Sequence, residues 1–266
     1  MRELERDSSP ELTDMPSLAI VGAGRVGRSL ARTAESAGLE LRLAGRGDAL
    51  GACREADAAL LCVPDSEIES ACESVAAAVP PLRFVGHVSG ATRLGALAAA
   101  GARGAAAFSL HPLQTFPDAM TAVAGTPCAI AGSDGGALVM AQSLAGLLGM
   151  RPFEVPEDRR DAYHAAAAMA SNLLVALEES AAELLERAGI EHARELLAPL
   201  VLRTAANWAE LGPEALTGPI ARGDADTVNR HREAIAQHAP QLASTYDELA
   251  ERARSVHAGR VEEPSR

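Results

Sequence analysis

Short apolar runs alternate with segments of helical length between Ser17 and about Val155. The runs read, in chain order, SLAIVG, LELRLAG, DAALLCVP, RFVGHVS, GAAAFSL, PCAIAGS and PFEVP. A strand followed by a helix and another strand requires a crossover connection, which makes the strands parallel. The pattern therefore predicts an α/β fold with a doubly wound, mainly parallel sheet.

The strand signals stop after Pro156, and only helical patterns follow. The stretch DRRDAYHAAAAMASNLLVALEESAAELLERAG predicts one helix from Asp158 to a glycine stop at Gly189. A second helix is expected from Glu191 to Leu211, and two more after the loop GPEALTGPIARGD. The C-terminal part is thus predicted to be all-helical.

We expect two folded domains, over residues 16–157 and 158–256. The 266 residues of the chain are enough for a sizeable core in either arrangement. Residues 1–15 and 257–266 are charged, aperiodic and contain Pro and Ser, which predicts disordered tails.

Composition favours small-molecule chemistry. The net charge of −12 disfavours nucleic acids and anionic membranes as partners, because phosphate binding relies on clustered cations. No apolar run is long enough to span a membrane, and the N-terminus lacks a signal-peptide pattern. The four cysteines form no C-x-x-C pair, which favours reduced thiols in a cytoplasmic protein and no metal site. All 24 basic residues are arginines, so Schiff-base chemistry on lysine is excluded.

A glycine-rich turn follows the first predicted strand. In VGAGRVG, Gly22, Gly24 and Gly27 form the pattern G-x-G-x-x-G between a strand and a helix. Gly22 permits the tight turn, Gly24 lets the backbone approach a pyrophosphate, and Gly27 lets helix and strand pack closely. We expect a Rossmann dinucleotide site here, with Arg25 and Val26 also at the cofactor.

The residues after the second predicted strand indicate which dinucleotide is bound. A carboxylate at the strand end would accept the ribose hydroxyls of NAD, but the chain has Gly45 and Arg46 there, with Asp48 further on. An arginine can bind a 2′-phosphate through charge-assisted hydrogen bonds. Arg46 therefore favours NADP, while Asp48 keeps NAD open; the alternative is a solvated Arg46.

The ends of the next strands are expected at the same ligand edge. Val63 and Pro64 are predicted under the adenosine or pyrophosphate, and Ser89 beside the nicotinamide. His87 lies inside its strand and is expected to be packed. His111, in SLHPLQTF, lies at another strand end, where a catalytic role competes with a structural one.

Polar residues interrupt the apolar run of the first long helix. In a continuous helix, His164, Ser171 and Asn172 share one broad face, with His164 and Asn172 about 12 Å apart along the axis. We expect His164 and Asn172 to be catalytic and Ser171 to bind substrate. The alternative is that they are satisfied polar groups at a domain seam, as we expect for Tyr163.

The loop LTGPIARGD carries candidate substrate ligands. Thr217 and Arg222 suit a substrate carboxylate, because the arginine fork matches two oxygens. Asp224 is equally suited to cap the next helix or to pair with Arg222. The sequence is consistent both with a loop that binds substrate and with a purely structural loop.

A resemblance to a known family covers most of the chain, from Ser17 to about Arg254. It rests on six motifs: GAGRVG, VPDSEI, HVSGA, SLHPLQTF, YHAAAAMASNLLVAL and LTGPIARGD. With them the chain resembles a bacterial family that joins a Rossmann-like domain to a C-terminal helical domain of unknown function. That family is similar to the superfamily of ketopantoate reductases, pyrroline-5-carboxylate reductases and 6-phosphogluconate dehydrogenases. The resemblance implies NAD(P)-dependent hydride transfer in a cleft between the domains, and a homodimer formed through the helical domain.

One departure from that superfamily bears on the chemistry. Ketopantoate reductases and 3-hydroxyacid dehydrogenases carry a lysine on the first long helix, with an asparagine one turn later. Asn172 matches the asparagine, but Ala168 stands at the lysine position. His164, one turn before Ala168, is expected to supply the proton instead, because histidines ordinarily titrate near neutral pH.

These observations leave three functional hypotheses. The first is NADPH-dependent reduction of a small, ketopantoate-like 2-oxo acid. The second is an imine reductase or a prephenate-type dehydrogenase, since SLHPLQTF is also similar to the His-Pro segment of prephenate dehydrogenases. The third is a non-catalytic NADP-binding sensor or interaction protein, which the missing lysine supports.

Overall fold

The computed structural model describes residues 17–262 of the chain. The tail expected over residues 1–15 lies outside this range. The chain divides into two compact units, with the boundary between Ala168 and Met169, and each is described by itself. Within residues 17–262, every helix is too short or too polar to span a lipid bilayer.

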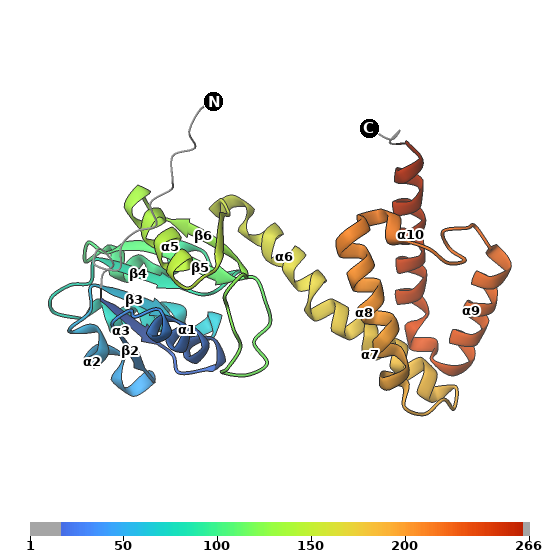
Figure 1. The fold of residues 1–266 in the computed structure, drawn as a ribbon, viewed down its shortest axis with the longest axis horizontal. Helices are drawn as coiled ribbons and strands as arrows, with labels where there is room; N and C mark the ends of the chain where they lie inside the picture. The colour runs from blue at the N-terminus through green and yellow to red at the C-terminus, as the bar shows by residue number, and fades with distance from the viewer. Residues whose placement is uncertain (1–16, 263–266) are drawn as a thin grey trace. The chain divides into compact units, whose positions relative to one another are not determined.

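The first unit is built on a seven-stranded sheet (Figure 1). Its strands are β1 (Leu18–Val21), β2 (Leu41–Ala44), β3 (Ala58–Leu61), β4 (Phe84–His87), β5 (Ala106–Pro112), β6 (Pro127–Gly132) and β7 (Arg151–Glu154). Their order in space is β2-β1-β3-β4-β5-β6-β7, with β6 antiparallel to β5 and all other neighbours parallel. All seven predicted strands are present, so the doubly wound, mainly parallel sheet is confirmed.

Helices cover both faces of this sheet. They are α1 (Arg25–Ser36), α2 (Ala49–Cys53), α3 (Ile68–Ala76), α4 (Ala98–Gly101) and α5 (Gly135–Leu147), with 3₁₀ turns η2 (Arg46–Asp48), η3 (Asp65–Glu67), η4 (Leu94–Leu97) and η5 (Glu157–Arg159). Leu18 and Ile20 of β1 belong to the core beneath α1 and α5, whereas Ala19 and Val21 belong to the core beneath α2, α3 and α4. Because both faces are buried, the strands read as unbroken apolar runs in the sequence.

The second unit is all-helical, as predicted. It contains α7 (Asn172–Arg187), α8 (Ala193–Leu211), α9 (Ala225–His238) and α10 (Ala243–Glu262), with 3₁₀ turns η6 (Gly212–Ala215) and η7 (Pro240–Leu242). Pro199 lies inside α8, so the sequence pattern correctly continued the helix through it.

The helix expected from Asp158 to Gly189 is wrong in one respect, because it is two helices. After η5, α6 (Arg160–Ala170) ends before Ser171, whose φ of −127° and ψ of −79° leave helical geometry, and α7 starts at Asn172. Serine and asparagine are weak helix formers because their side chains compete for the backbone. The face predicted to join His164, Ser171 and Asn172 therefore does not follow from helical periodicity.

The expected C-terminal tail also begins too early. We placed it at residue 257, but α10 runs on to Glu262. Arg254 pairs with Glu251 one turn earlier in this helix. Such i, i+3 pairs support an exposed helix, and an aperiodic charged sequence does not reveal them.

Candidate functional site

The three glycines of the turn between β1 and α1 have different surroundings. Gly22 has a φ of +116°, and a Cβ there would overlap the carbonyl oxygen of Cys62. A Cβ on Gly27 would overlap the carbonyl oxygen of Gly22, so close packing at the start of α1 requires glycine. Gly24 caps α1, and a Cβ on it would meet nothing within 4 Å. The turn is thus tight at Gly22 and Gly27 and open at Gly24.

A cleft of about 550 Å³ lies beside this turn. It is lined by the turn, by the ends of β3, β4 and β5 and by the loop after β5: Gly24, Arg25, Val26, Cys62, Val63, Pro64, Val88, His111, Pro112, Gln114 and Phe116. Five residues predicted to bind a cofactor therefore share one hollow with His111, which was predicted to be catalytic. The carboxyl ends of parallel strands are where open α/β sheets bind ligands.

The N-terminus of α1 at this cleft suits an anion. The first turn contains no acidic residue, and Gly24 offers no capping side chain. The first N–H groups of a helix lack partners within the helix, and its dipole adds partial positive charge there. Arg25 brings a full positive charge to the same wall of the cleft. These features fit the phosphates of a dinucleotide.

Two other predicted cofactor residues stand differently. Ser89 is buried, and its Oγ accepts hydrogen bonds from the backbone N–H groups of Ala91 (3.2 Å) and Thr92 (2.9 Å). It shapes the turn after β4 and does not line the cleft. Arg46 begins η2 after β2, as expected, but its side chain lies outside the described part, so its role stays a prediction.

Two histidines and a tyrosine meet around Gly90, in the loop that follows β4. The Nδ1 atom of His111 lies 2.6 Å from the hydroxyl of Tyr163. The rings of His111 and His164 have centroids 6.3 Å apart. A Cβ on Gly90 would lie 2.9 Å from His111 Nε2 and from His164 Cδ2. Only a glycine lets both imidazoles pack this closely against the loop, and His111 also lines the cleft.

The surroundings keep His111 and Tyr163 neutral at physiological pH. Burial, helped by His164 and Arg160, lowers the pKa of His111 to about 4, against a smaller opposing effect of Asp65. Burial also raises the pKa of Tyr163 to about 12. Desolvation disfavours whichever form is charged, which explains the opposite directions.

Sequence reasoning missed Arg160, a buried residue that is hydrogen-bonded to segments next to this cluster. Its side chain is buried and donates to Glu157 Oε1 (2.8 Å), to the Ser89 carbonyl oxygen (3.3 Å) and to Ser109 Oγ (2.6 Å). Glu157 in turn accepts from the backbone N–H of Leu94 (2.8 Å). The network joins β5 and the loop after β4 to the first turn of α6. The i, i+3 spacing of Glu157 and Arg160 was a visible signal, but the burial of the arginine was not.

The remaining predicted residues belong to the second unit. Asn172 is exposed in the first turn of α7, and Thr217 and Arg222 are exposed in the loop before α9. Asp224 caps α9 by accepting from the backbone N–H (3.0 Å) and the hydroxyl (2.7 Å) of Thr227. Of the two readings left open for Asp224, capping is observed. The roles of the others stay predictions.

Two protein-family models match parts of this chain. Residues 47–112 match the model of a Rossmann-like domain, and residues 126–253 match that of a domain of unknown function, DUF2520. The chain thus combines a match to a Rossmann-like domain with a match to a domain of unknown function that follows it. The resemblance drawn from the sequence motifs is therefore confirmed.

Several solved structures share the fold of this chain. A Bacteroides fragilis protein assigned as an NADP oxidoreductase is 18% identical, with a TM-score of 0.75 over 91% of this chain and 98% of that one. A Thermotoga maritima protein is 22% identical, with a TM-score of 0.72 over 92% and 100%. A reductive aminase from Aspergillus terreus, in complex with NADPH and ethyl levulinate, is 18% identical, with a TM-score of 0.65 over 90% and 94%. No curated protein matches the chain.

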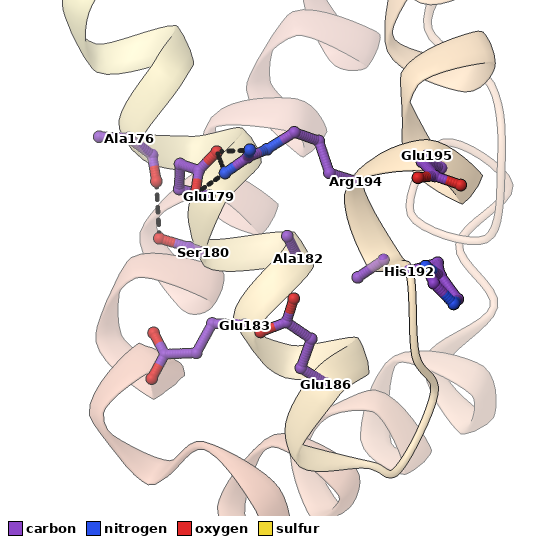
Figure 2. A pocket seen from close by; sticks show the side chains of 10 residues that line it. Ala176, Glu179, Ser180, Ala182, Glu183, Glu186, His192, Arg194 and Glu195 are labelled. Carbon is purple, nitrogen blue, oxygen red and sulfur yellow. Dashed lines mark hydrogen bonds and ion pairs between the residues drawn. The ribbon is translucent and has the colours of Figure 1, made fainter.

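A second hollow, of about 540 Å³, lies between α7 and α8 of the DUF2520 domain. Figure 2 shows Arg194 reaching across it to Glu179, at 2.9 Å. Glu183 accepts from Arg187 and Gln241. Within residues 17–262 (side chains of 46 and 260–262 excluded), no group of three or more His, Cys, Asp or Glu side chains is arranged to hold a metal ion. Three charged side chains that line the hollow, Glu179, Glu183 and Arg194, are thus already paired, and the cleft of the first unit is the better candidate site.

His87 was expected to be packed inside its strand, and it is fully buried in β4. Neither ring nitrogen has a hydrogen-bond partner. Burial, with a smaller effect of the positive charge of Arg160, lowers the pKa of His87 to about 4. The folded protein therefore holds a neutral imidazole that an unfolded chain would protonate below about pH 6.5.

Because of His87, the folded protein becomes less stable as the pH falls. The contribution of neutral His87 is complete above about pH 6.5 and is lost as the pH falls towards 4, because only the unfolded state then gains a proton. We expect His87→Leu to remove about 3 kcal/mol of the loss in unfolding free energy between pH 7 and pH 4. Urea denaturation at both pH values measures it, and equal losses in the variant and the wild type would contradict the assignment.

Proposed function

We propose that this chain is an NAD(P)-dependent oxidoreductase that uses NADPH to reduce a small, ketopantoate-like 2-oxo acid. The observation that carries the proposal is the single cleft of the first unit, with a glycine-rich turn on one wall and His111 on another. The NADP and NADPH in the names of the structural neighbours support the choice of cofactor.

The residues present fit the cofactor. Gly24, the N-terminus of α1 and Arg25 would hold the pyrophosphate, Val63 and Pro64 would lie against the nucleotide, and Arg46 is proposed to bind the 2′-phosphate. Bound there, NADPH would supply the hydride. Everything else falls to the chain's own side chains.

His164 is proposed to supply the proton to the nascent alkoxide. His111, neutral and on the other side of Gly90, would donate a hydrogen bond to the same oxygen. Neither role requires a lysine, which the chain does not contain. General acid catalysis of this kind contributes about a hundredfold or more to rate.

The second unit is proposed to supply substrate contacts. Asn172 would orient the carbonyl, and Ser171, Thr217 and Arg222 would bind the substrate carboxylate. The exposed positions of Asn172, Thr217 and Arg222 leave them available for a ligand. The fork of Arg222 matches the two carboxylate oxygens.

We also propose a homodimer formed through the helical unit. In α8, Leu196, Leu200, Leu202, Trp208 and Leu211 are exposed, although monomers rarely expose large contiguous apolar patches. The four cysteines are free, which supports a cytoplasmic location. Sedimentation equilibrium should give twice the 27.5 kDa of one chain, and a monomer at micromolar concentration would refute the dimer.

Two alternatives are tested by the same enzyme assays. Imine reduction or prephenate-type oxidation is favoured by the reductive aminase among the neighbours and by the His-Pro segment at His111. A sensor that binds NADP without turnover is favoured by the absence of lysine. Substrate profiling distinguishes the first alternative from the reduction of 2-oxo acids. Tight binding of NADP without hydride transfer would favour the second alternative.

Gly24→Ala tests the cofactor site. The added Cβ meets no protein atom, so the melting temperature should stay within about 2 °C of wild type, while the methyl group blocks the pyrophosphate and raises the Kd for NADPH at least about tenfold. Isothermal titration calorimetry measures the Kd. Gly95→Ala, also in open space but away from the cleft, is the matched control. Equal affinity in wild type and Gly24→Ala would argue against a dinucleotide here.

A further inference from the structure

Both tyrosines of the chain lie against the Nδ1 atom of a histidine. Tyr163 lies 2.6 Å from His111 Nδ1, and Tyr246 lies 2.9 Å from His231 Nδ1. The rings meet edge to face in both pairs. The first pair is part-buried and its histidine lines the cleft, whereas the second is exposed in the helical unit.

The direction of the hydrogen bond determines where the proton of His111 lies. A neutral imidazole has one N–H donor and one acceptor nitrogen, whereas a neutral phenol always has a donor. Tyr163 and His111 are both neutral at physiological pH. Because a phenol is the stronger acid, its O–H is the better donor, so Nδ1 accepts and the imidazole proton is left on Nε2. Nε2 is the ring nitrogen that Tyr163 leaves unbonded, and His111 lines the cleft.

We propose that Tyr163 fixes His111 as the Nε2–H tautomer, and that this fixed donor makes the site select carbonyl substrates over protonated imines. The inference rests on the proposed reductase function and names its substrate class. Tyr163 is thereby a positioning residue, since it acts through His111.

The selection follows from matching donors with acceptors. A carbonyl oxygen has two lone pairs and accepts from both His111 and His164. The nitrogen of a protonated imine is itself a donor and carries a positive charge, so it would leave the Nε2–H group unpaired. The positive charge of Arg160, which disfavours a proton on His111, also disfavours a second cation beside it. Leaving this buried donor unpaired would lower kcat/KM for the protonated imine about tenfold or more.

The tautomer can be read without any enzyme assay. Long-range ¹H–¹⁵N correlation spectra of the full-length, ¹⁵N-labelled protein distinguish protonated from unprotonated ring nitrogens, and His111→Gln assigns the His111 signals by their loss. We expect an unprotonated Nδ1 and a protonated Nε2 in wild type at pH 7. Tyr163→Phe should give a mixture of tautomers at His111. Tyr246→Phe, the same substitution in the matched pair, should change His231 and leave His111 unaltered.

The selectivity is measured as a ratio of kcat/KM values. With NADPH, wild type should prefer 2-oxo acids over a cyclic imine that is protonated at neutral pH by at least about tenfold. Tyr163→Phe should lower the ratio of kcat/KM for the oxo acid to kcat/KM for the imine, chiefly because kcat for the oxo acid falls. The Kd for NADPH should not change. Tyr246→Phe should keep the wild-type ratio.

Three outcomes overturn the proposal. The first is a wild-type His111 protonated on Nδ1, which is decisive even if Tyr163→Phe does not fold. The second is an unchanged His111 tautomer in a folded Tyr163→Phe variant. The third is a wild-type preference for the protonated imine. If the expected tautomer is found but neither substrate is reduced, the proposed function fails, and with it the selection, while the hydrogen-bond assignment stands.

Discussion

His164→Ala is expected to lower kcat for 2-oxo acid reduction about a hundredfold. The imidazole borders the corner at Gly90 opposite His111, and its proton has no substitute on a lysine, because the chain has none. The Kd for NADPH should not change, since His164 does not line the cleft. Steady-state kinetics measure kcat, and isothermal titration calorimetry measures the Kd.

His231→Ala is the matched control, because it removes an imidazole from the helical unit. Its kcat and its Kd for NADPH should equal those of wild type. A His164→Ala variant that retains wild-type kcat would remove His164 from the mechanism. A loss of NADPH affinity equal to the loss of kcat would instead indicate a binding role.

Arg160→Met is expected to reduce the free energy of unfolding by about 3 kcal/mol. The substitution keeps an unbranched apolar stem but leaves Ser109 Oγ, the Ser89 carbonyl oxygen and one oxygen of Glu157 without their partner. Each buried polar group left unpaired costs about 1–3 kcal/mol, and the exposed part of Glu157 regains water, which limits the total. Urea denaturation followed by circular dichroism measures the change.

Arg159→Met provides the control, because Arg159 is the exposed neighbour on the same turn. It should alter stability by less than about 0.5 kcal/mol. Equal effects of the two substitutions would show that the buried network contributes nothing specific. Because Arg160 ties α6 to the strand ends, Arg160→Met should also lower kcat in whatever protein remains folded.

The strands and the glycine-rich turn were predictable because their signals are local. A strand buried on both faces is apolar at every position, as LAIV and AALL are in β1 and β3. Gly22 and Gly27 are required by contacts with a neighbouring strand and turn, so their spacing carries the information. His111 was found because a strand end is visible in sequence.

The rest depended on contacts between distant segments. Tyr163 was set aside as structural, yet it meets His111, 52 positions earlier in the chain. Arg160 looked like any surface arginine until its bonds to Ser89 and Ser109 were seen. The end of α6 at Ser171 was hidden because alanines on both sides continue the helical pattern. Local propensity cannot report such tertiary partners.

The central claim is that this chain transfers hydride from NADPH to a carbonyl carbon. The most direct test incubates wild-type protein with NADPH deuterated at C4 of the nicotinamide and a panel of 2-oxo acids that includes ketopantoate, followed by mass spectrometry of the products. The account predicts a 2-hydroxy acid with one deuterium on the carbon that bears the hydroxyl group, formed at least about tenfold more slowly by Gly24→Ala at the same subsaturating NADPH. Tight NADPH binding with no labelled product from any oxo acid would contradict it.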